Sequence, residues 1–208
     1  MRLSRIFIQQ LLIVGSKVQL DTATSHYARN VLRLKTGTNI ILFNSLDRCD
    51  YVSKLCFDGK KTFASIASTL DCNTESSLDS EIIQGLSRND HLDWMIQKTT
   101  ELGVKHISIF NSNHSQIPVK PNQLEKKQHH WRAIAINACE QSGRHVPPEI
   151  VFFNNLQSLL DAPYQRENKF LLDFQGPRLV TLLKTQPKSP QISIMLGAEG
   201  GLSVTEIG

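Results

Sequence analysis

The fold of this chain is decided by the stretch Gln191-Ile-Ser-Ile-Met-Leu-Gly-Ala-Glu-Gly-Gly-Leu-Ser-Val-Thr-Glu-Ile-Gly208. Its apolar run, Ile192 to Leu196, is typical of a buried strand. The glycines that follow let the backbone approach a ligand closely, because they carry no Cβ atom. Ser203 and Glu206 have the spacing of a capping box, which opens a helix. The stretch therefore predicts a strand, a ligand-binding glycine loop and the start of a helix.

Strands and helices alternate from residue 81 onward. Strands are predicted at 82–86, 104–110, 150–153, 170–174 and 192–196. One predicted helix turns Leu92, Met95, Ile96 and Leu102 inward and ends at Gly103; another carries the stripe Trp131, Ile134, Ala135, Ala138 and Cys139 and ends at Ser142-Gly143. This alternation predicts an α/β domain with a mostly parallel sheet covered on both faces. Ligands bind such sheets at the carboxyl ends of the strands, where residues 197–201 lie.

The first third of the chain is rich in β-strand patterns instead. Short strands are predicted at 6–8, 17–20, 39–43, 50–57 and 62–67, with a hairpin turn at Asp58-Gly59. One helix, Thr22 to Leu34, is expected to turn Tyr27, Val31 and Leu34 inward and to set His26, Arg29 and Arg33 along another face. Residues 72–80 are polar and indicate a linker. The sequence thus predicts a small β-barrel over 1–71 and an α/β domain over 81–208.

The charge of the chain is concentrated in its first domain. Residues 1–71 carry a net charge of +5, against −1 for residues 72–208. A basic domain suits a polyanion such as nucleic acid, and a solvated basic surface is the simpler alternative. No apolar run approaches the roughly 18 residues of a membrane span, and the start lacks a signal-peptide pattern. The four scattered cysteines indicate a reducing, cytoplasmic setting and argue against structural zinc.

Three segments, taken in order, carry a resemblance to a known family. They are Gln84-Gly-Leu-Ser-Arg88, Ala138-Cys-Glu-Gln-Ser-Gly-Arg144 and Met195-Leu-Gly-Ala-Glu-Gly-Gly-Leu-Ser203. Behind a basic β-domain, this set resembles the RsmE family, SPOUT-class methyltransferases that methylate N3 of a uridine in 16S ribosomal RNA. The resemblance implies a PUA-like RNA-binding barrel, a SPOUT-type α/β domain with a trefoil knot, S-adenosylmethionine as cofactor, the small ribosomal subunit as partner, and a homodimer.

The same resemblance implies roles for individual residues. Arg88 and Arg144 are the catalytic candidates, because an arginine can pair with the developing N3 anion or with a neighbouring phosphate. Either could instead be a surface arginine paired with Asp90 or Glu140. The candidate cofactor contacts are Leu172, Leu196, Gly197, Glu199, Gly200 and Gly201. Leu172 could instead belong to the core, and the glycines could form a plain turn that needs positive φ.

RNA contacts are expected in the basic first domain. The candidates are Arg2, Arg5, Arg29, Arg33 and Lys35, and their contacts would be mostly to phosphate. Glu140 and Gln141 are expected either to bridge to the substrate or a second subunit, or to form the polar end of a helix.

Some positions depart from the family's pattern. His114 stands where members usually have arginine, and Ala198 where they usually have proline. The chain also lacks the C-terminal helix, strand and knot-closing segment of the family, so we expect weak binding of S-adenosylmethionine. The alternative is then a catalytically impaired, RNA-binding fragment. A nucleotide-binding oxidoreductase is a further alternative, disfavoured because the first strand lacks a glycine fingerprint.

Overall fold

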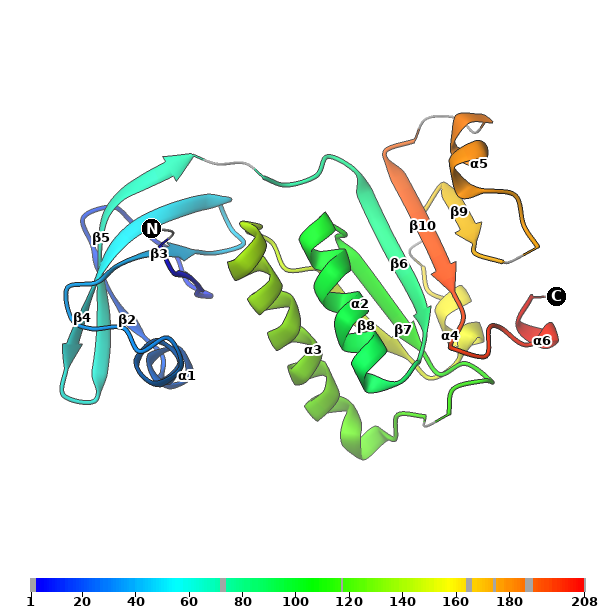
Figure 1. Ribbon diagram of the computed structural model, residues 1–208, viewed down its shortest axis with the longest axis horizontal. Coiled ribbons are helices and arrows are strands. Elements are labelled where there is room, and N and C mark those ends of the chain that lie inside the picture. Colours follow the sequence, from blue (N-terminus) through cyan, green and yellow to red (C-terminus); the bar gives the residue numbers. More distant parts are fainter. Residues whose placement is uncertain are drawn as a thin grey trace. The chain divides into compact units, whose positions relative to one another are not determined.

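The chain forms two units in the computed structural model, each described here by itself (Figure 1). The structure describes residues 3–71, 74–116, 118–163, 166–173, 175–185 and 189–207. Residues 1–75 and 139–146 make up the first unit, and residues 76–138 and 147–208 the second. This division differs from a simple split at the predicted linker, because residues 139–146 return to the first unit.

The first unit is built on a five-stranded sheet of order β1-β3-β4-β5-β2. Its strands are β1 (Arg5–Phe7), β2 (Lys17–Leu20), β3 (Asn39–Phe43), β4 (Cys49–Asp58) and β5 (Lys61–Asp71). The predicted hairpin is confirmed, since Asp58 pairs with Lys61 and Gly59 takes a φ of +53° between them. Alternate side chains of these strands form one apolar core, which includes Ile6, Ile40, Leu42 and Leu55.

The helix predicted over 22–34 is shorter and changes type within its length. An α-helix, α1 (Thr22–His26), continues as a π-helical turn, η1 (Tyr27–Val31). The wider turn is fixed by a bond from Leu32 N to Tyr27 O of 2.9 Å. The 3.6-residue period therefore fails, so Val31 is 60% exposed and Ala28 is buried in its place. Arg33 lies beyond the helix at a φ of +52°, so its predicted place on a helical face was wrong.

The second unit contains a five-stranded parallel sheet of order β8-β7-β6-β10-β9, as the alternating pattern predicts. Its strands are β6 (Asp79–Gly85), β7 (His106–Phe110), β8 (Glu149–Phe153), β9 (Asn168–Leu171) and β10 (Gln191–Leu196). Its helices are α2 (Asn89–Leu102), α3 (Pro121–Ser142, which runs on into the first unit), α4 (Leu156–Leu160), α5 (Leu179–Thr185) and α6 (Val204–Ile207). β9 ends earlier than the predicted strand, and Phe174 lies outside the described residues.

One face of this sheet is covered by α2 and α3, which lie side by side in Figure 1. Leu92 and Ile96 of α2 and Trp131 of α3 pack there on β7. Leu102 was predicted to join them but is 76% exposed, and Thr100 is buried instead. The opposite face carries α4 and a cavity, so coverage of both faces is only partial in the described chain. None of the helices described here has the length and apolar character to span a membrane.

The strand order creates a natural ligand site. From β6 the chain proceeds to β7 and β8 on one side, whereas β10 pairs with β6 on the other. In open α/β sheets, ligands bind at the carboxyl ends of strands where the order reverses in this way. The ends of β6 and β10 are therefore the expected position of a functional site.

Candidate functional site at the carboxyl edge of the parallel sheet

Three loops follow β6, β7 and β10, and hydrogen bonds join them. Gln84 at the end of β6 donates its side-chain amide to Gly197 O at 2.8 Å. Ser115, after β7, donates its hydroxyl to Leu86 O at 2.8 Å. The imidazole of His114 lies 2.9 Å from Gly200 O. These bonds make one connected site of segments that are far apart in the sequence.

Glu199 connects the glycine loop to the start of α2. Its Oε1 accepts a hydrogen bond from Arg88 N at 2.8 Å and lies 3.1 Å from His91 Nδ1. The bond from Arg88 N, together with those from Glu199's own backbone and His91, holds the pKa of Glu199 below its ordinary value. The carboxylate thereby fixes Arg88, the N-cap residue of α2, next to the loop.

Glu206 makes a second connection, between the loops after β10 and β7. Its carboxylate accepts bonds from Ser203 N at 2.9 Å and from Asn113 N at 3.0 Å, and the Ser112 hydroxyl lies at 3.3 Å. Burial alone would raise the pKa of Glu206, but these hydrogen bonds outweigh it and lower the pKa. The predicted pairing of Ser203 with Glu206 at the start of a helix is confirmed. The sequence did not reveal that the same carboxylate holds Asn113.

The glycines permit close packing of the chain on itself. A Cβ atom on Gly85 would lie 2.7 Å from Ala198 N, and one on Gly197 would lie 2.7 Å from Leu202 N and closer still to the backbone of Gly201. Of the loop glycines, Gly201 takes a positive φ, +73°. The plain-turn interpretation thus holds at Gly201, whereas Gly197 is explained by close approach of backbone to backbone.

The predicted cofactor contacts meet at this edge. Leu196, Gly197, Glu199, Gly200 and Gly201 end β10 and form its loop. Leu172 follows the neighbouring strand β9, and its N–H donates to Met195 O at 2.9 Å. Its side chain is 44% exposed, so the alternative of a core residue was wrong. The two strand ends place Leu172 and the glycine loop along the same border of the sheet.

The two catalytic candidates lie in different units. Arg88 belongs to the second unit and is 59% exposed, with Nη2 3.4 Å from Asp90 Oδ2, so the alternative pairing with Asp90 is confirmed. Arg144 belongs to the first unit, where it donates to Thr74 O and lies 3.9 Å from Glu75 Oε2. The alternative pairing of Arg144 with Glu140 was wrong.

Arg5 is buried and cannot serve as the surface RNA contact predicted for it. Its Nη2 lies 2.7 Å from Asp50 Oδ1, and its Nη1 donates to Cys139 O at 2.7 Å. The buried His145 also lies 3.0 Å from Asp50 Oδ1. Burial would raise the pKa of Asp50, but bonds from His145 and Arg5 lower it. Arg5 is therefore a structural residue of the first unit.

Glu140 and Gln141 lie in the last turn of α3, as the helix-end interpretation predicts, and Glu140 is buried. It accepts bonds from Phe7 N at 3.1 Å and from the Tyr27 hydroxyl at 3.0 Å. Burial raises the pKa of Glu140, and burial together with this carboxylate raises the pKa of Tyr27 to about 12. Glu140 anchors the last turn of α3 within the first unit.

The other basic candidates differ in exposure. Arg33 and Lys35 are exposed. Arg29 is half-buried, with its guanidinium 4.3 Å from the centre of the Phe57 ring and its Nε donating to the Thr62 hydroxyl at 3.1 Å. Arg2 lies outside the described residues.

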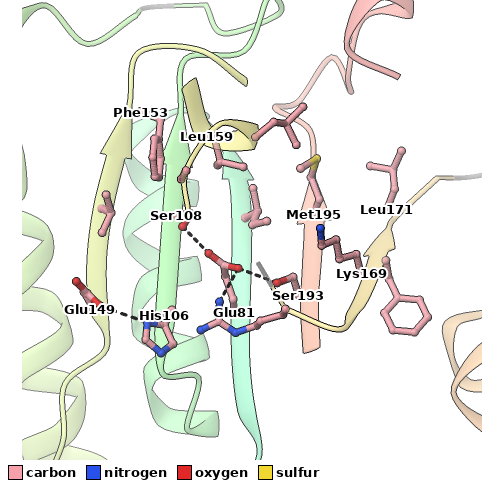
Figure 2. Close-up of a pocket in the computed structure, with 16 residues that line it drawn as sticks. Glu81, His106, Ser108, Glu149, Phe153, Leu159, Lys169, Leu171, Ser193 and Met195 are labelled. Atoms are coloured by element: carbon pink, nitrogen blue, oxygen red, sulfur yellow. Dashed lines mark hydrogen bonds and ion pairs between the residues drawn. The ribbon is translucent and has the colours of Figure 1, made fainter. Parts of the chain in front are cut away.

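A cavity of about 480 Å³ lies on the sheet face that carries α4 (Figure 2). Glu81 on its floor accepts bonds from the Ser108 and Ser193 hydroxyls at 2.6 and 2.7 Å, and from Arg166 Nη1 at 2.8 Å. Its walls are largely apolar. The carboxylate of Glu81 is already paired with a guanidinium and hydrogen-bonded within the second unit. Among the described residues, no cluster of His, Cys, Asp and Glu is suited to a metal ion.

We predict that the stabilisation from Glu199 is present above about pH 4.5 and is lost at more acid pH. Since its folded-state pKa is depressed, the unfolded chain takes up the proton first, and acid favours unfolding. Urea unfolding of the wild type and Glu199→Gln should therefore show a difference in free energy that shrinks as the pH falls through the folded-state pKa. A difference that grows on acidification would contradict this assignment.

Comparison with known proteins places the chain in a family. Residues 74–208 match the model of the RNA methyltransferase domain. The chain is 29% identical to ribosomal RNA small subunit methyltransferase E of Buchnera aphidicola (from Schizaphis graminum), over 99% of this chain and 83% of the relative. It is 27% identical to the Bacillus subtilis enzyme of the same name, over 96% of this chain and 84% of the relative.

Solved structures agree over nearly the whole chain. A Legionella pneumophila protein described as a methyltransferase, in complex with S-adenosylmethionine, has a TM-score of 0.89 and 29% identity, covering 100% of this chain and 84% of that one. The Neisseria gonorrhoeae ribosomal RNA small subunit methyltransferase E, also bound to S-adenosylmethionine, has a TM-score of 0.84 and 27% identity, covering 99% and 84%. The fold is thus that of an α/β methyltransferase rather than an oxidoreductase. The chain belongs to the RsmE family of RNA methyltransferases.

Proposed function

We propose that this protein transfers a methyl group from S-adenosylmethionine to N3 of a uridine in 16S ribosomal RNA of the small subunit. The observation that supports this most is the loop after β10, which Glu199 holds against the start of α2. It lies at the carboxyl edge of a sheet whose fold is similar to two structures that contain S-adenosylmethionine.

The residues at this edge fit the cofactor. Leu196 ends β10 and Leu172 follows the adjacent strand β9, and both offer apolar surface of the kind that lines adenine sites. Gly197, Gly200 and Gly201 carry no side chain, which keeps the loop compact at the strand ends where a nucleoside would bind. When bound, S-adenosylmethionine supplies an electrophilic methyl group on a sulfonium.

The chain's own residues must position the base and stabilise the charge that develops on it. Arg88 lies at the same edge, with its backbone fixed by Glu199 and its guanidinium exposed to solvent. A permanently charged guanidinium can stabilise the anion of a deprotonated uracil or pair with an adjacent phosphate. Its contact with Asp90 is an exposed ion pair, which is weak enough to be exchanged for substrate.

The remaining features of the family belong to this proposal. The first unit would be a PUA-like barrel that contacts RNA phosphates through Arg29, Arg33 and Lys35. The second would be a SPOUT domain with a trefoil knot, acting as a homodimer in the cytoplasm, and Arg144 would assist catalysis. The basic character of residues 1–71 supports the RNA-binding part of this assignment.

The decisive experiment is a calorimetric titration of the 208-residue chain with S-adenosylmethionine, followed by methylation of small ribosomal subunits that lack the modification. The methylated nucleoside is then compared by mass spectrometry with N3-methyluridine. Detectable binding of S-adenosylmethionine and formation of N3-methyluridine are expected. A folded chain that binds no cofactor, or a product methylated at another atom, would refute the proposal.

For Arg88 we expect Arg88→Ala to lower kcat/KM for RNA by roughly tenfold, the effect of losing one charge-assisted hydrogen bond. Affinity for S-adenosylmethionine should stay unchanged, because the backbone of residue 88 still donates to Glu199. Single-turnover methylation and calorimetry measure the two quantities. Arg88→Lys should restore only part of the rate, since an ammonium lacks the planar fork of guanidinium. Full activity of Arg88→Ala would exclude the role.

A further inference from the structure

A second cavity, of about 390 Å³, opens at the start of α2 in the second unit. Its lining comes from the loop after β6, the first turn of α2, the loop after β7 and α3. The lining residues are Leu86, Ser87, Arg88, Asn89, Asp90, Gln116 and Lys127. We infer that this cavity binds a backbone phosphate of the RNA beside the methylated nucleotide, with Lys127 as a direct contact. This inference rests on the proposed function.

The charge of Lys127 is available for such a ligand. Its Nζ lies 2.9 Å from Asn89 Oδ1, a neutral acceptor. Within the described parts of the chain, no carboxylate lies within ion-pair distance of Lys127. The ammonium is thus positioned over the cavity by an amide that does not neutralise it.

Arg88 supplies a second cation to the lining of the cavity. The single acidic residue of the lining is Asp90, which lies 3.4 Å from Arg88 and is 62% exposed. An exposed pair of this kind contributes little and exchanges readily for a better partner. Two cations and one carboxylate leave one positive charge, which matches the single negative charge of a phosphodiester.

The location suits the nucleotide next to the target. Arg88 donates its backbone N–H to Glu199, so the cavity directly adjoins the glycine loop proposed to hold the cofactor. The α2 N-cap has no side-chain hydrogen bond, and the first turn of a helix adds a partial positive charge. Gln116 adds an amide that can bond a ribose hydroxyl. A phosphate in the cavity would therefore hold the strand while its base reaches the loop.

Lys127→Ala tests the inference, with Lys126→Ala as the matched control. Lys126 is the preceding residue of α3, is exposed, and does not line the cavity. Binding of a fluorescein-labelled oligouridylate is followed by anisotropy across a salt series. For Lys127→Ala we expect roughly tenfold weaker binding at low salt and a salt slope reduced by about one. Lys127→Arg should restore the slope, and Lys126→Ala should keep the wild-type slope.

The same variants are then assayed for methylation of small ribosomal subunits. KM for the subunit should rise in Lys127→Ala, with kcat and the affinity for S-adenosylmethionine unchanged. A wild-type salt slope in Lys127→Ala, or an equal loss in Lys126→Ala, would overturn the inference. If the wild type fails to methylate but the slope depends on Lys127, the proposed function fails and the phosphate site stands. If the wild type methylates and Lys127→Ala leaves KM unchanged, only the phosphate site fails.

Discussion

Replacing Arg5 with methionine is expected to lower the free energy of unfolding by about 3–5 kcal/mol, the cost of breaking a buried ion pair from one side. The guanidinium lies 2.7 Å from Asp50, donates to Cys139 O at 2.7 Å and to Arg144 O at 3.2 Å, and its side chain is 5% exposed. Methionine keeps the apolar stem but leaves Asp50 with less charge compensation and removes the hydrogen bonds that Arg5 donates to two carbonyls.

Urea unfolding monitored by circular dichroism measures this loss. Arg33→Met is the control, because Arg33 is exposed and its replacement removes an equal charge. This substitution should change the free energy of unfolding by less than about 0.5 kcal/mol. Adding Asp50→Asn to Arg5→Met should cost less than the sum of the single changes, since the uncompensated carboxylate is then absent. Strict additivity, or equal effects of Arg5→Met and Arg33→Met, would show that the buried pair is not coupled.

The second large effect is expected from Gly197→Ala. The new Cβ would lie 2.7 Å from Leu202 N and closer to Gly201, and these are backbone atoms that cannot rotate away. The loop must shift, which costs about 1–3 kcal/mol of stability for an overpacked site. Because the same loop is the proposed cofactor contact, affinity for S-adenosylmethionine should fall by roughly a hundredfold or more, which is about 2.7 kcal/mol.

Gly176→Ala is the matched control for this change. Gly176 has no positive φ, and the nearest atom to its added Cβ would be Asp173 O at 3.4 Å, an ordinary contact. Thermal unfolding and calorimetric titration should leave Gly176→Ala within about 0.5 kcal/mol of the wild type. Unchanged cofactor affinity in Gly197→Ala would show that the loop conformation does not determine the site.

The fold of both units was largely predictable because hydrophobic periodicity reports burial directly. The apolar runs Ile192–Leu196 and Asn39–Phe43 each became strands, and the stripe that includes Trp131 and Ala135 became the inner face of α3. The prediction of which side chains are buried was wrong where a backbone feature changed the number of residues per helical turn. The π-helical turn moved Val31 to the surface, and no local pattern signals such a turn.

The position of the site was predictable, but the contacts that build it were not. Glycine-rich sequence after a strand indicated the loop, whereas the bonds of Glu199 to Arg88 and of Glu206 to Asn113 join residues far apart in the chain. The same holds for Arg5, which in sequence is one more basic residue of a basic domain. Whether a charge faces water or a buried partner depends on tertiary pairing, which composition does not report.

The return of residues 139–146 to the first unit has a consequence for how the protein is made on the ribosome. Arg5, Phe7 and Thr74 take bonding partners from this late segment, and His145 reaches Asp50. Domains usually fold in the order in which they are translated. Here the nascent first unit emerges without the partners that residues 139–146 supply, and it completes its structure only after residue 146 has been synthesised, when residues 76–138 of the second unit have already been translated.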